Sequence, residues 1–117
     1  MSIANPGSFT EHELRIAQAF AERHDRHRLL AEGMRREVAA MFGLGVDDLT
    51  GKKRRSDIVD ARSVLVYILR ERAFTYAEIG RLLNRDYSTI YYLERRIALD
   101  FELLRLAEEI TPLRAAV

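Results

Sequence analysis

Cysteine is absent from the 117-residue chain. Its absence excludes a disulfide framework and any metal site built from thiolates, and it fits a reducing compartment. Only two prolines and six glycines interrupt a sequence that is 48% hydrophobic and 32% charged. These proportions are those of a folded globular protein, and the scarcity of helix breakers predicts an all-α fold.

Long apolar runs are also missing, because no stretch approaches the roughly 20 residues of a membrane-spanning helix. The first residues, MSIANPGSFTEHE, lack the basic and then apolar segments of a secretory signal. We therefore expect a cytoplasmic protein with no membrane partner.

Signals for catalysis and for cofactors are equally sparse. The acidic residues are scattered among arginines instead of being gathered in one cluster, so we predict no catalytic residues, no cofactor and no enzyme activity. His24 and His27 have a spacing that can hold a metal on one helix, but no third ligand is evident. We therefore predict no metal site, with surface histidines as the alternative.

Positive charge is concentrated in the middle of the chain. Residues 51–96 carry eleven lysines and arginines against six acidic residues, whereas residues 1–50 and 97–117 are both mildly acidic. A basic segment between acidic ends predicts a localised anionic partner, although a basic run can also be a solvated surface.

The first part of the chain predicts two helices after a leader over residues 1–9. The helices are expected over residues 10–24 and 27–42, and Ser8 with Glu11 has the spacing of a capping box for the first of them. The first shows helical spacing of Leu14, Ala17, Phe20 and Ala21, and the second has one apolar stripe of Leu30, Met34, Val38 and Met41 or Phe42.

Gly43 is suited to end the second helix in a left-handed conformation, and a single helical turn should follow it and bury Val46 and Leu49. A basic loop, KKRR at residues 52–55, comes next. Asp57 can then cap a helix over residues 57–72. The expected inward face of that helix consists of Ile58, Ala61, Leu65, Ile68 and Leu69.

The segment TYAEIGRLLNRDYSTIYYLERR gathers arginine, tyrosine and hydroxyl side chains in one run. The capping-box spacing of Thr75 and Glu78 predicts a short helix over residues 76–83. Asn84 suits a left-handed turn position, and Asp86 can cap a longer helix.

That longer helix is expected to reach about residue 109, where Thr111 and Pro112 should end it. Its inward stripe would consist of Ile90, Leu93, Ile97, Phe101 and Leu104.

A short helix, a turn and a longer helix together predict a helix-turn-helix motif. In such motifs the first residues of the second helix reach base edges in the major groove. Arginine can pair with guanine, aspartate can accept from cytosine, and hydroxyl or tyrosyl groups can contact several bases. The candidates are Arg85, Asp86, Tyr87, Ser88 and Thr89, with Tyr91 and Tyr92 one turn on and Arg96 as a further arginine of the same segment. Periodicity alone leaves open an ordinary surface helix.

Four quoted pieces make the pattern specific: VAAMFGLGVDDLTGKKRR, ARSVLVYILRE, YAEIGRLL and RDYSTIYYLERRI, in this order. From about residue 38 to 97, the chain resembles the C-terminal DNA-binding domain of the bacterial replication initiator DnaA. The last piece is similar to the family stretch R-D-H-T/S-T-V-x-H-x-x-R-K-I. The resemblance implies a helical bundle that binds double-stranded DNA at short specific sites, with the second helix of the motif in the major groove and the basic loop in the minor groove.

The resemblance also implies roles by position. Base reading falls to Asp86, Tyr87, Ser88 and Thr89, and Ala77 stands where the family usually has a base-contacting proline. The basic loop consists of Lys52, Lys53, Arg54 and Arg55, and Arg62 matches an arginine expected to face phosphate. The chain departs from the family pattern at Tyr87, which replaces a histidine, at the shorter turn before Arg85, and at Ser56, which occupies the usual minor-groove arginine position.

No G-x-x-x-x-G-K-[ST] phosphate loop occurs in the chain, so we expect a DNA-reading module without an ATPase domain. The expected organisation is a single helical domain over residues 10–110 with a DnaA-like core over residues 38–97 and a tail over residues 111–117. We expect a nucleoid-associated role in replication control or transcription regulation, including that of a mobile element. The alternative is a protein–protein adaptor or a dimerising accessory factor, such as an origin- or packaging-site marker, in which DNA contact is secondary. A homodimer or a protein partner would then be bound through residues 10–24 and 98–110.

Overall fold

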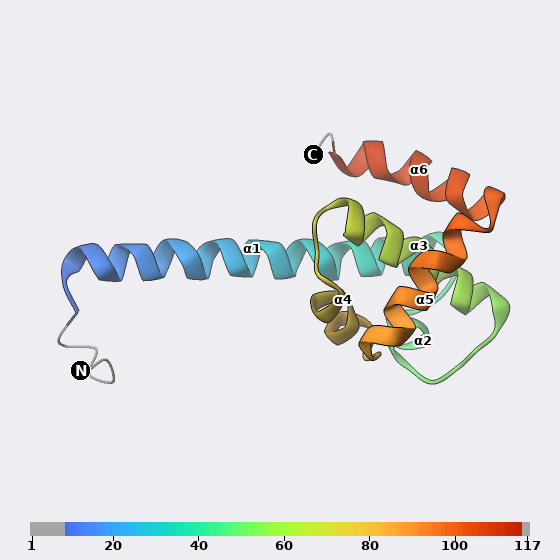
Figure 1. Ribbon diagram of the computed structural model, residues 1–117, viewed down its shortest axis with the longest axis horizontal. Helices are drawn as coiled ribbons and strands as arrows, with labels where there is room; N and C mark the ends of the chain where they lie inside the picture. The colour runs from blue at the N-terminus through green and yellow to red at the C-terminus, as the bar shows by residue number, and fades with distance from the viewer. Residues whose placement is uncertain (1–8, 116–117) are drawn as a thin grey trace. The chain divides into compact units, whose positions relative to one another are not determined.

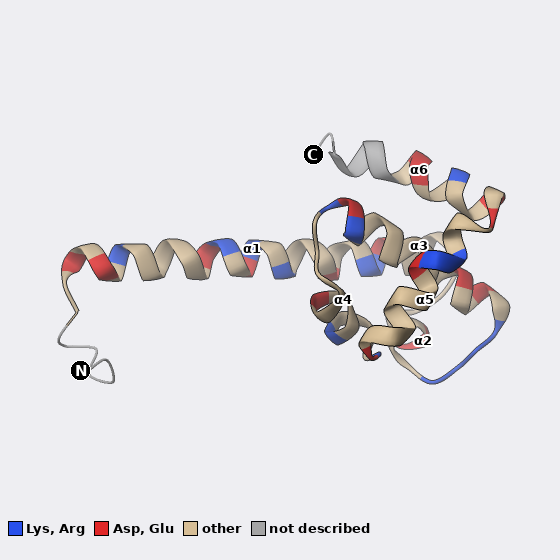
Figure 2. Cartoon of the chain, viewed as in Figure 1, with Lys and Arg blue, Asp and Glu red and all other residues tan. Residues whose placement is uncertain are grey.

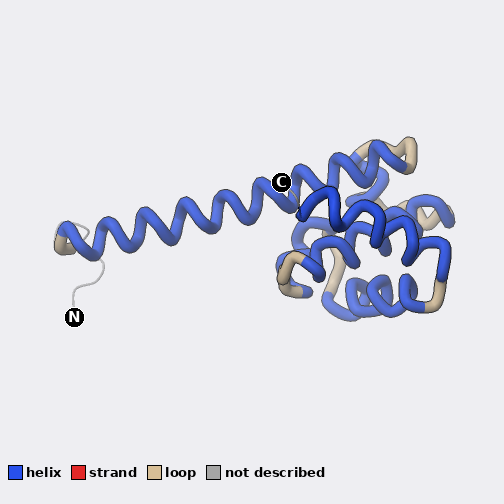
Figure 3. Tube along the Cα trace, turned by 90° about the horizontal axis from the view of Figure 1, so that it is seen from above, coloured by secondary structure: helices blue, strands red, loops and turns tan. Residues whose placement is uncertain are grey.

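The computed structural model describes residues 9–115, which form six α-helices joined by short loops and contain no β-strand (Figures 1 and 3). The expected all-α fold is therefore confirmed. Among the described helices, none is long and apolar enough to cross a membrane. The helices are α1 (Glu11–Met41), α2 (Val46–Thr50), α3 (Ser56–Glu71), α4 (Tyr76–Leu83), α5 (Tyr87–Ala98) and α6 (Phe101–Ala115).

The chain divides into two compact units, residues 1–30 and residues 31–117. The described part of the first unit is mainly the amino-terminal portion of α1. This helix begins with a capping box in which the Thr10 amide donates to the Glu13 carboxylate at 3.0 Å and the Glu13 amide donates to the Thr10 hydroxyl at 3.1 Å. The box therefore lies two residues after the predicted one, and Ser8 itself is outside the described residues.

The prediction of two helices over residues 10–24 and 27–42 is wrong, because α1 is continuous from Glu11 to Met41. The segment between them, Asp25 and Arg26, contains neither proline nor glycine, so nothing in the backbone ends the helix there. Leu14 and Phe20, two of the apolar residues that predicted the first helix, are exposed, with 46% and 67% of their surface accessible.

The core of the second unit is centred on α3, which packs against α5 and α6. All five of its predicted inward residues, Ile58, Ala61, Leu65, Ile68 and Leu69, are fully buried. Met34 and Val38 from α1 join this core, whereas Leu30 and Met41, expected on the same face, are exposed. Gly43 ends α1 with a φ of 69°, the left-handed conformation that its position predicted.

The beginning of α3 differs from the prediction by about one residue. The helix begins at Ser56 after Arg55, so Asp57 lies in its first turn and does not precede the helix. The Asp57 carboxylate accepts a hydrogen bond from the Ile58 amide at 2.9 Å and pairs with the Arg55 guanidinium. Leu49, in α2, is fully buried as expected.

The long helix expected from residue 86 to 109 is instead two helices, α5 and α6, separated at Leu99 and Asp100. Asp100 accepts a hydrogen bond from the Leu103 amide at 3.1 Å and thereby caps α6. Phe101 is consequently 74% exposed and not part of the core. The buried residues of α6 are Leu103, Ala107 and Ile110.

The helical backbone of α6 also continues to Ala115, past the predicted stop at Thr111 and Pro112. An interior proline removes one backbone hydrogen bond and its ring crowds the preceding turn, so α6 continues through Pro112 at that cost.

Candidate nucleic-acid interface

Helix α4 and the turn after it have the local structure that the sequence predicts. Thr75 and Glu78 form a reciprocal capping box, with hydrogen bonds of 2.8 and 3.1 Å. The helix ends at Asn84, whose φ of 55° and ψ of 47° are left-handed. The Arg85 amide then donates to the Gly80 carbonyl at 2.9 Å, which closes the turn. The turn is therefore held by backbone bonds on both sides of Asn84.

Gly80 allows this turn to pass close to α4. A Cβ atom at this position would lie 2.7 Å from the Arg85 carbonyl oxygen, much closer than van der Waals contact. The absence of a side chain at Gly80 therefore sets how tightly α5 follows α4.

Asp86 caps α5 as predicted. One carboxylate oxygen accepts from the Thr89 amide at 3.0 Å and from the Ser88 hydroxyl at 2.9 Å. The hydrogen bond from the Thr89 backbone, followed by that from Ser88, lowers the pKa of Asp86. The carboxylate is therefore charged at neutral pH and stabilises the positive end of the helix.

The amino end of α5 is open to solvent. Tyr87 and Tyr92 are 62% and 60% exposed, Ser88 is exposed, and Thr89 is half-buried. Behind them Ile90, Leu93 and Ile97 are buried. The helix therefore presents polar and aromatic groups outward at its start and anchors itself through an apolar face.

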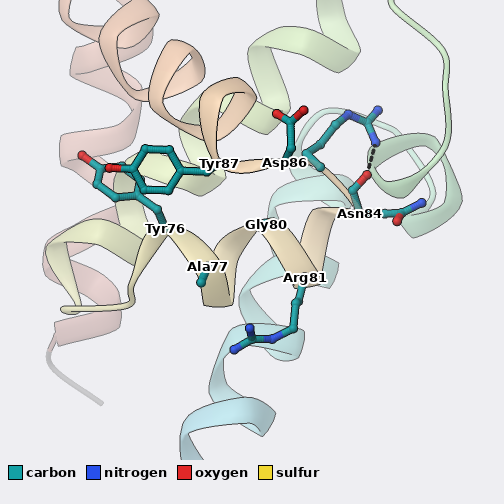
Figure 4. Close-up of a pocket in the computed structure, with 8 residues that line it drawn as sticks. Tyr76, Ala77, Gly80, Arg81, Asn84, Asp86 and Tyr87 are labelled. Carbon is teal, nitrogen blue, oxygen red and sulfur yellow. Dashed lines mark hydrogen bonds between the residues drawn. The ribbon is translucent and has the colours of Figure 1, made fainter.

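Tyrosine rings form a cluster beside this end. The Tyr76 ring centroid lies 5.0 Å from that of Tyr87 and 6.1 Å from that of Tyr91, and the first of these pairs is seen in Figure 4. The Tyr76 hydroxyl donates to Glu94, which chiefly raises the pKa of Tyr76. Arg70 completes the group, because it pairs with Glu94 at 3.2 Å and lies 4.1 Å from the Tyr76 ring centroid.

A surface hollow of about 470 Å³ lies between α4 and the start of α5 (Figure 4). Ala77 and Arg81 are exposed on its α4 side, one helical turn apart. Sequence reasoning missed Arg81, although its spacing of four residues from Ala77 places both on one helix face. The full lining consists of Tyr76, Ala77, Gly80, Arg81, Asn84, Arg85, Asp86 and Tyr87.

The basic loop is exposed along residues 52–55 and is drawn in blue between α2 and α3 in Figure 2. Lys53 pairs with Asp48 at 3.4 Å, and Arg55 pairs with Asp57 at 3.1 Å. Lys52 and Arg54 form no ion pair with any residue in the described part of the chain. These two residues are consequently the loop cations best placed to meet an external anion.

Arg62 is placed differently from the expectation of a phosphate contact. Only 3% of its surface is accessible, and its guanidinium donates to backbone carbonyl groups at the carboxyl end of α2. Burial is the main reason why the pKa of Arg62 is lowered, with repulsion from Arg85 and Arg54 adding to it. Its acceptors are the carbonyl groups of Asp48 at 3.0 Å, Leu49 at 2.9 Å and Gly51 at 2.9 Å.

Arg85 also turns toward the protein. Its guanidinium donates to the Gly51 carbonyl and, at 3.3 Å, to the Thr50 carbonyl. The same group donates to the carbonyl groups of Leu83 at 3.0 Å and Asn84 at 3.2 Å. Arg62 of α3 and Arg85 of the turn before α5 thus share the Gly51 carbonyl as an acceptor.

Arg96 joins α5 to α3. Its guanidinium lies 2.6 Å from the Asp60 carboxylate and 3.4 Å from the Ser63 hydroxyl. Both side chains of the ion pair are about three-quarters covered. Contacts from Arg96, Arg62 and Arg85 to DNA therefore stay predictions, and each of these side chains has a defined role within the fold.

The helical arrangement and the exposed amino end of α5 define the class of this protein as a DNA-binding helix-turn-helix domain. Residues 32–97 match the family model described as the bacterial dnaA protein helix-turn-helix. This match covers more than half of the chain. The chain belongs to the bacterial DnaA helix-turn-helix family, as its motifs implied.

Individual relatives agree with this assignment. The chain is 37% identical over 92 residues to the chromosomal replication initiator protein DnaA of Roseiflexus castenholzii, a match that covers 76% of this chain and 19% of that protein. It is 33% identical over 88 residues to DnaA of Pelobacter propionicus, covering 70% and 20% respectively. The chain therefore spans about a fifth of the length of these relatives. No solved structure matches it.

Proposed function

We propose that the chain binds duplex DNA at short specific sites of the kind that DnaA reads. In this proposal, Ser88, Thr89 and the Tyr87 ring meet base edges in the major groove. The basic loop at residues 52–55 lies over the adjacent phosphates and minor groove. This DNA binding would serve replication control or transcription regulation. It would place the protein in the cytoplasm, associated with the nucleoid.

The observation that carries the proposal is the bond between the two expected contact regions. The turn that precedes α5 is hydrogen-bonded through Arg85 to Thr50 and Gly51, where the basic loop begins. The amino end of α5 and the loop are therefore neighbours, and one duplex can meet both. The same contacts suggest that Arg62 and Arg85 support the interface from within.

Selection of bound duplexes from a random pool tests the proposal directly. We expect one short sequence to be enriched, and we expect Thr89→Ala to weaken binding to that sequence by about 1–3 kcal/mol and to weaken binding to a scrambled duplex less. Thr89→Ser, which keeps the hydroxyl and removes the methyl group, is the matched control. If no sequence is enriched, the proposal of specific DNA binding is wrong. If Thr89→Ala weakens binding to both duplexes equally, Thr89 does not read a base.

A second function, self-association, is favoured by the surface of the first unit. Ile16 and Phe20 on α1 are 57% and 67% exposed. Residues 11–22 contain three acidic residues and one arginine, whereas residues 23–30 contain three arginines and one aspartate. A second copy in antiparallel orientation would set each acidic segment against a basic one and cover Ile16 and Phe20 in the acidic segment.

A further inference from the structure

The root of the basic loop consists of Thr50, the last residue of α2, and Gly51, and its carbonyl groups accept hydrogen bonds from two arginines. Its carbonyl groups follow the last turn of α2, where helical carbonyls have no partner inside the helix. Arg62 approaches from α3 and Arg85 approaches from the turn before α5. Both guanidinium groups donate to the Gly51 carbonyl.

We propose that Arg85 is a positioning residue that locks the basic loop to the DNA-reading helix, so that the two regions engage DNA as one rigid surface. This inference rests on the proposed DNA binding. It reassigns Arg85 from a direct contact with guanine to an internal tie, whose effect on DNA is transmitted through the loop.

The geometry supports a tie because one guanidinium bridges two chain segments. One nitrogen donates to Thr50 on one segment and to Leu83 on the other, and the second nitrogen donates to Gly51. A planar fork with several fixed donors suits this arrangement, whereas the compact ammonium of lysine does not.

Backbone carbonyl groups offset the electrostatic cost of this internal role. Arg85 lies close enough to Arg62 to lower the pKa of Arg62 by repulsion, in addition to the larger effect of burial. Two like charges remain together here because backbone carbonyl dipoles surround both of them. Loss of Arg85 would therefore leave the Thr50 carbonyl without this donor and would loosen the first residues of the loop.

The experiment compares Arg85→Gln and Arg85→Lys, with Arg81→Gln as the control. Arg81 lines the same hollow but is exposed. In the DNA-free protein, we expect both Arg85 variants to accelerate hydrogen exchange at the Gly51 amide about tenfold, while the amides of Ile90 and Leu93 keep their rates. The Gly51 amide reports the loop root because it donates to the Asp47 carbonyl at 2.9 Å. Arg81→Gln should leave its exchange unchanged.

Binding to the selected duplex separates a tie from a direct contact. Both Arg85 variants should weaken binding about tenfold, because neither side chain reproduces the fork. If Arg85 instead met a phosphate, lysine would retain most of the affinity, and this result would overturn the inference.

A double-mutant cycle completes the test, with Lys52→Ser and Arg54→Ser together as the loop variant. If Arg85 acts through the loop, Arg85→Gln should change affinity by less than about twofold once these loop charges are gone. If Arg85→Gln weakens binding by the same factor with and without the loop substitutions, the two sites act independently and the tie is contradicted. Failure of the wild-type protein to bind any duplex would overturn the proposed function, whereas unchanged Gly51 exchange in the Arg85 variants would overturn the tie alone.

Discussion

The carboxylate of Asp86 caps α5 in the fold and is also a proposed contact to a base. One of its oxygens accepts from Thr89 and Ser88 and so begins α5. In the proposed complex the same residue lies at the groove, where a carboxylate can accept from the cytosine amino group. Substitutions can separate these two roles because asparagine caps a helix about as well as aspartate does.

We predict that Asp86→Ala lowers the melting temperature by roughly 5 °C and that Asp86→Asn changes it little. Because the folded-state pKa of Asp86 is lowered, its stabilising effect is present above the usual pKa of 3.8 and is lost as the pH falls through the lowered value. Thermal unfolding of all three proteins between neutral and strongly acidic pH measures this. The difference between wild type and Asp86→Ala should shrink in acid; a difference that stayed constant with pH would contradict the charged cap.

Local signals in the sequence correctly predicted the residues that cap helices and form the turn. The Thr75–Glu78 box, the left-handed Asn84 and the Asp86 cap each involve residues no more than three positions apart. The partners of Arg62 and Arg85 within the fold were not predicted, for the opposite reason. Their acceptors lie 11 to 14 and 34 to 35 residues away at the end of α2, and a sequence pattern does not reveal which backbone carbonyls a distant arginine will reach.

At the scale of elements, the spacing between α4 and α5 depends on a glycine. Alanine normally stabilises a helix relative to glycine by up to about 1 kcal/mol. At Gly80 the added Cβ would meet the Arg85 carbonyl oxygen at 2.7 Å, so the turn would have to move. Gly33, in α1, offers a comparison, since a Cβ there would meet only the flexible end of Arg36 at 3.8 Å.

We therefore predict opposite signs for the same substitution. Gly80→Ala should lower the free energy of unfolding by about 1–3 kcal/mol because backbone must shift, whereas Gly33→Ala should raise it by up to about 1 kcal/mol. Denaturant unfolding measures both values. Equal stabilisation by the two alanines would mean that the turn accommodates a side chain and that Gly80 does not set the helix spacing.

The division between α5 and α6 shows what helical periodicity leaves undetermined. Ile90, Leu93 and Ile97 were correctly predicted to be buried, and the same spacing runs on to Phe101 and Leu104. The chain nevertheless changes direction at Leu99 and Asp100, because α3 packs against both resulting helices. An apolar stripe records which residues can be buried, but the choice between one long helix and two shorter ones belongs to tertiary packing.

At the scale of the whole molecule, charge and apolar surface are distributed differently in the two units. In the second unit the basic residues of segment 52–55 flank the helix-turn-helix, which suits a polyanion. In the first unit an acidic segment of α1, residues 11–22, is followed by a basic one, residues 23–30, and Ile16 and Phe20 are exposed within the acidic segment. A polyanion would be repelled by the acidic segment, whereas an antiparallel second copy of the helix can pair each segment with one of opposite charge.

We predict that the protein forms a dimer through this part of α1 and that Ile16→Ser with Phe20→Ser weakens the dimer roughly tenfold or more, because buried aromatic residues dominate most interfaces. Leu99→Ser is the matched control, since Leu99 is 88% exposed in the second unit, and it should leave association unchanged. Sedimentation equilibrium over a range of protein concentrations measures both.

Charge reversal tests the pairing itself. Glu11→Lys with Glu22→Lys in one variant, which leaves the capping residue Glu13 in place, and Arg23→Glu, Arg26→Glu and Arg28→Glu in another should each prevent self-association, because both segments of each helix then carry net charge of one sign. An equimolar mixture of the two should form heterodimers that weaken as salt is added. A monomeric wild-type protein at every concentration, or charge-reversed variants that still dimerise separately, would contradict this arrangement and leave each DNA-reading domain to act alone.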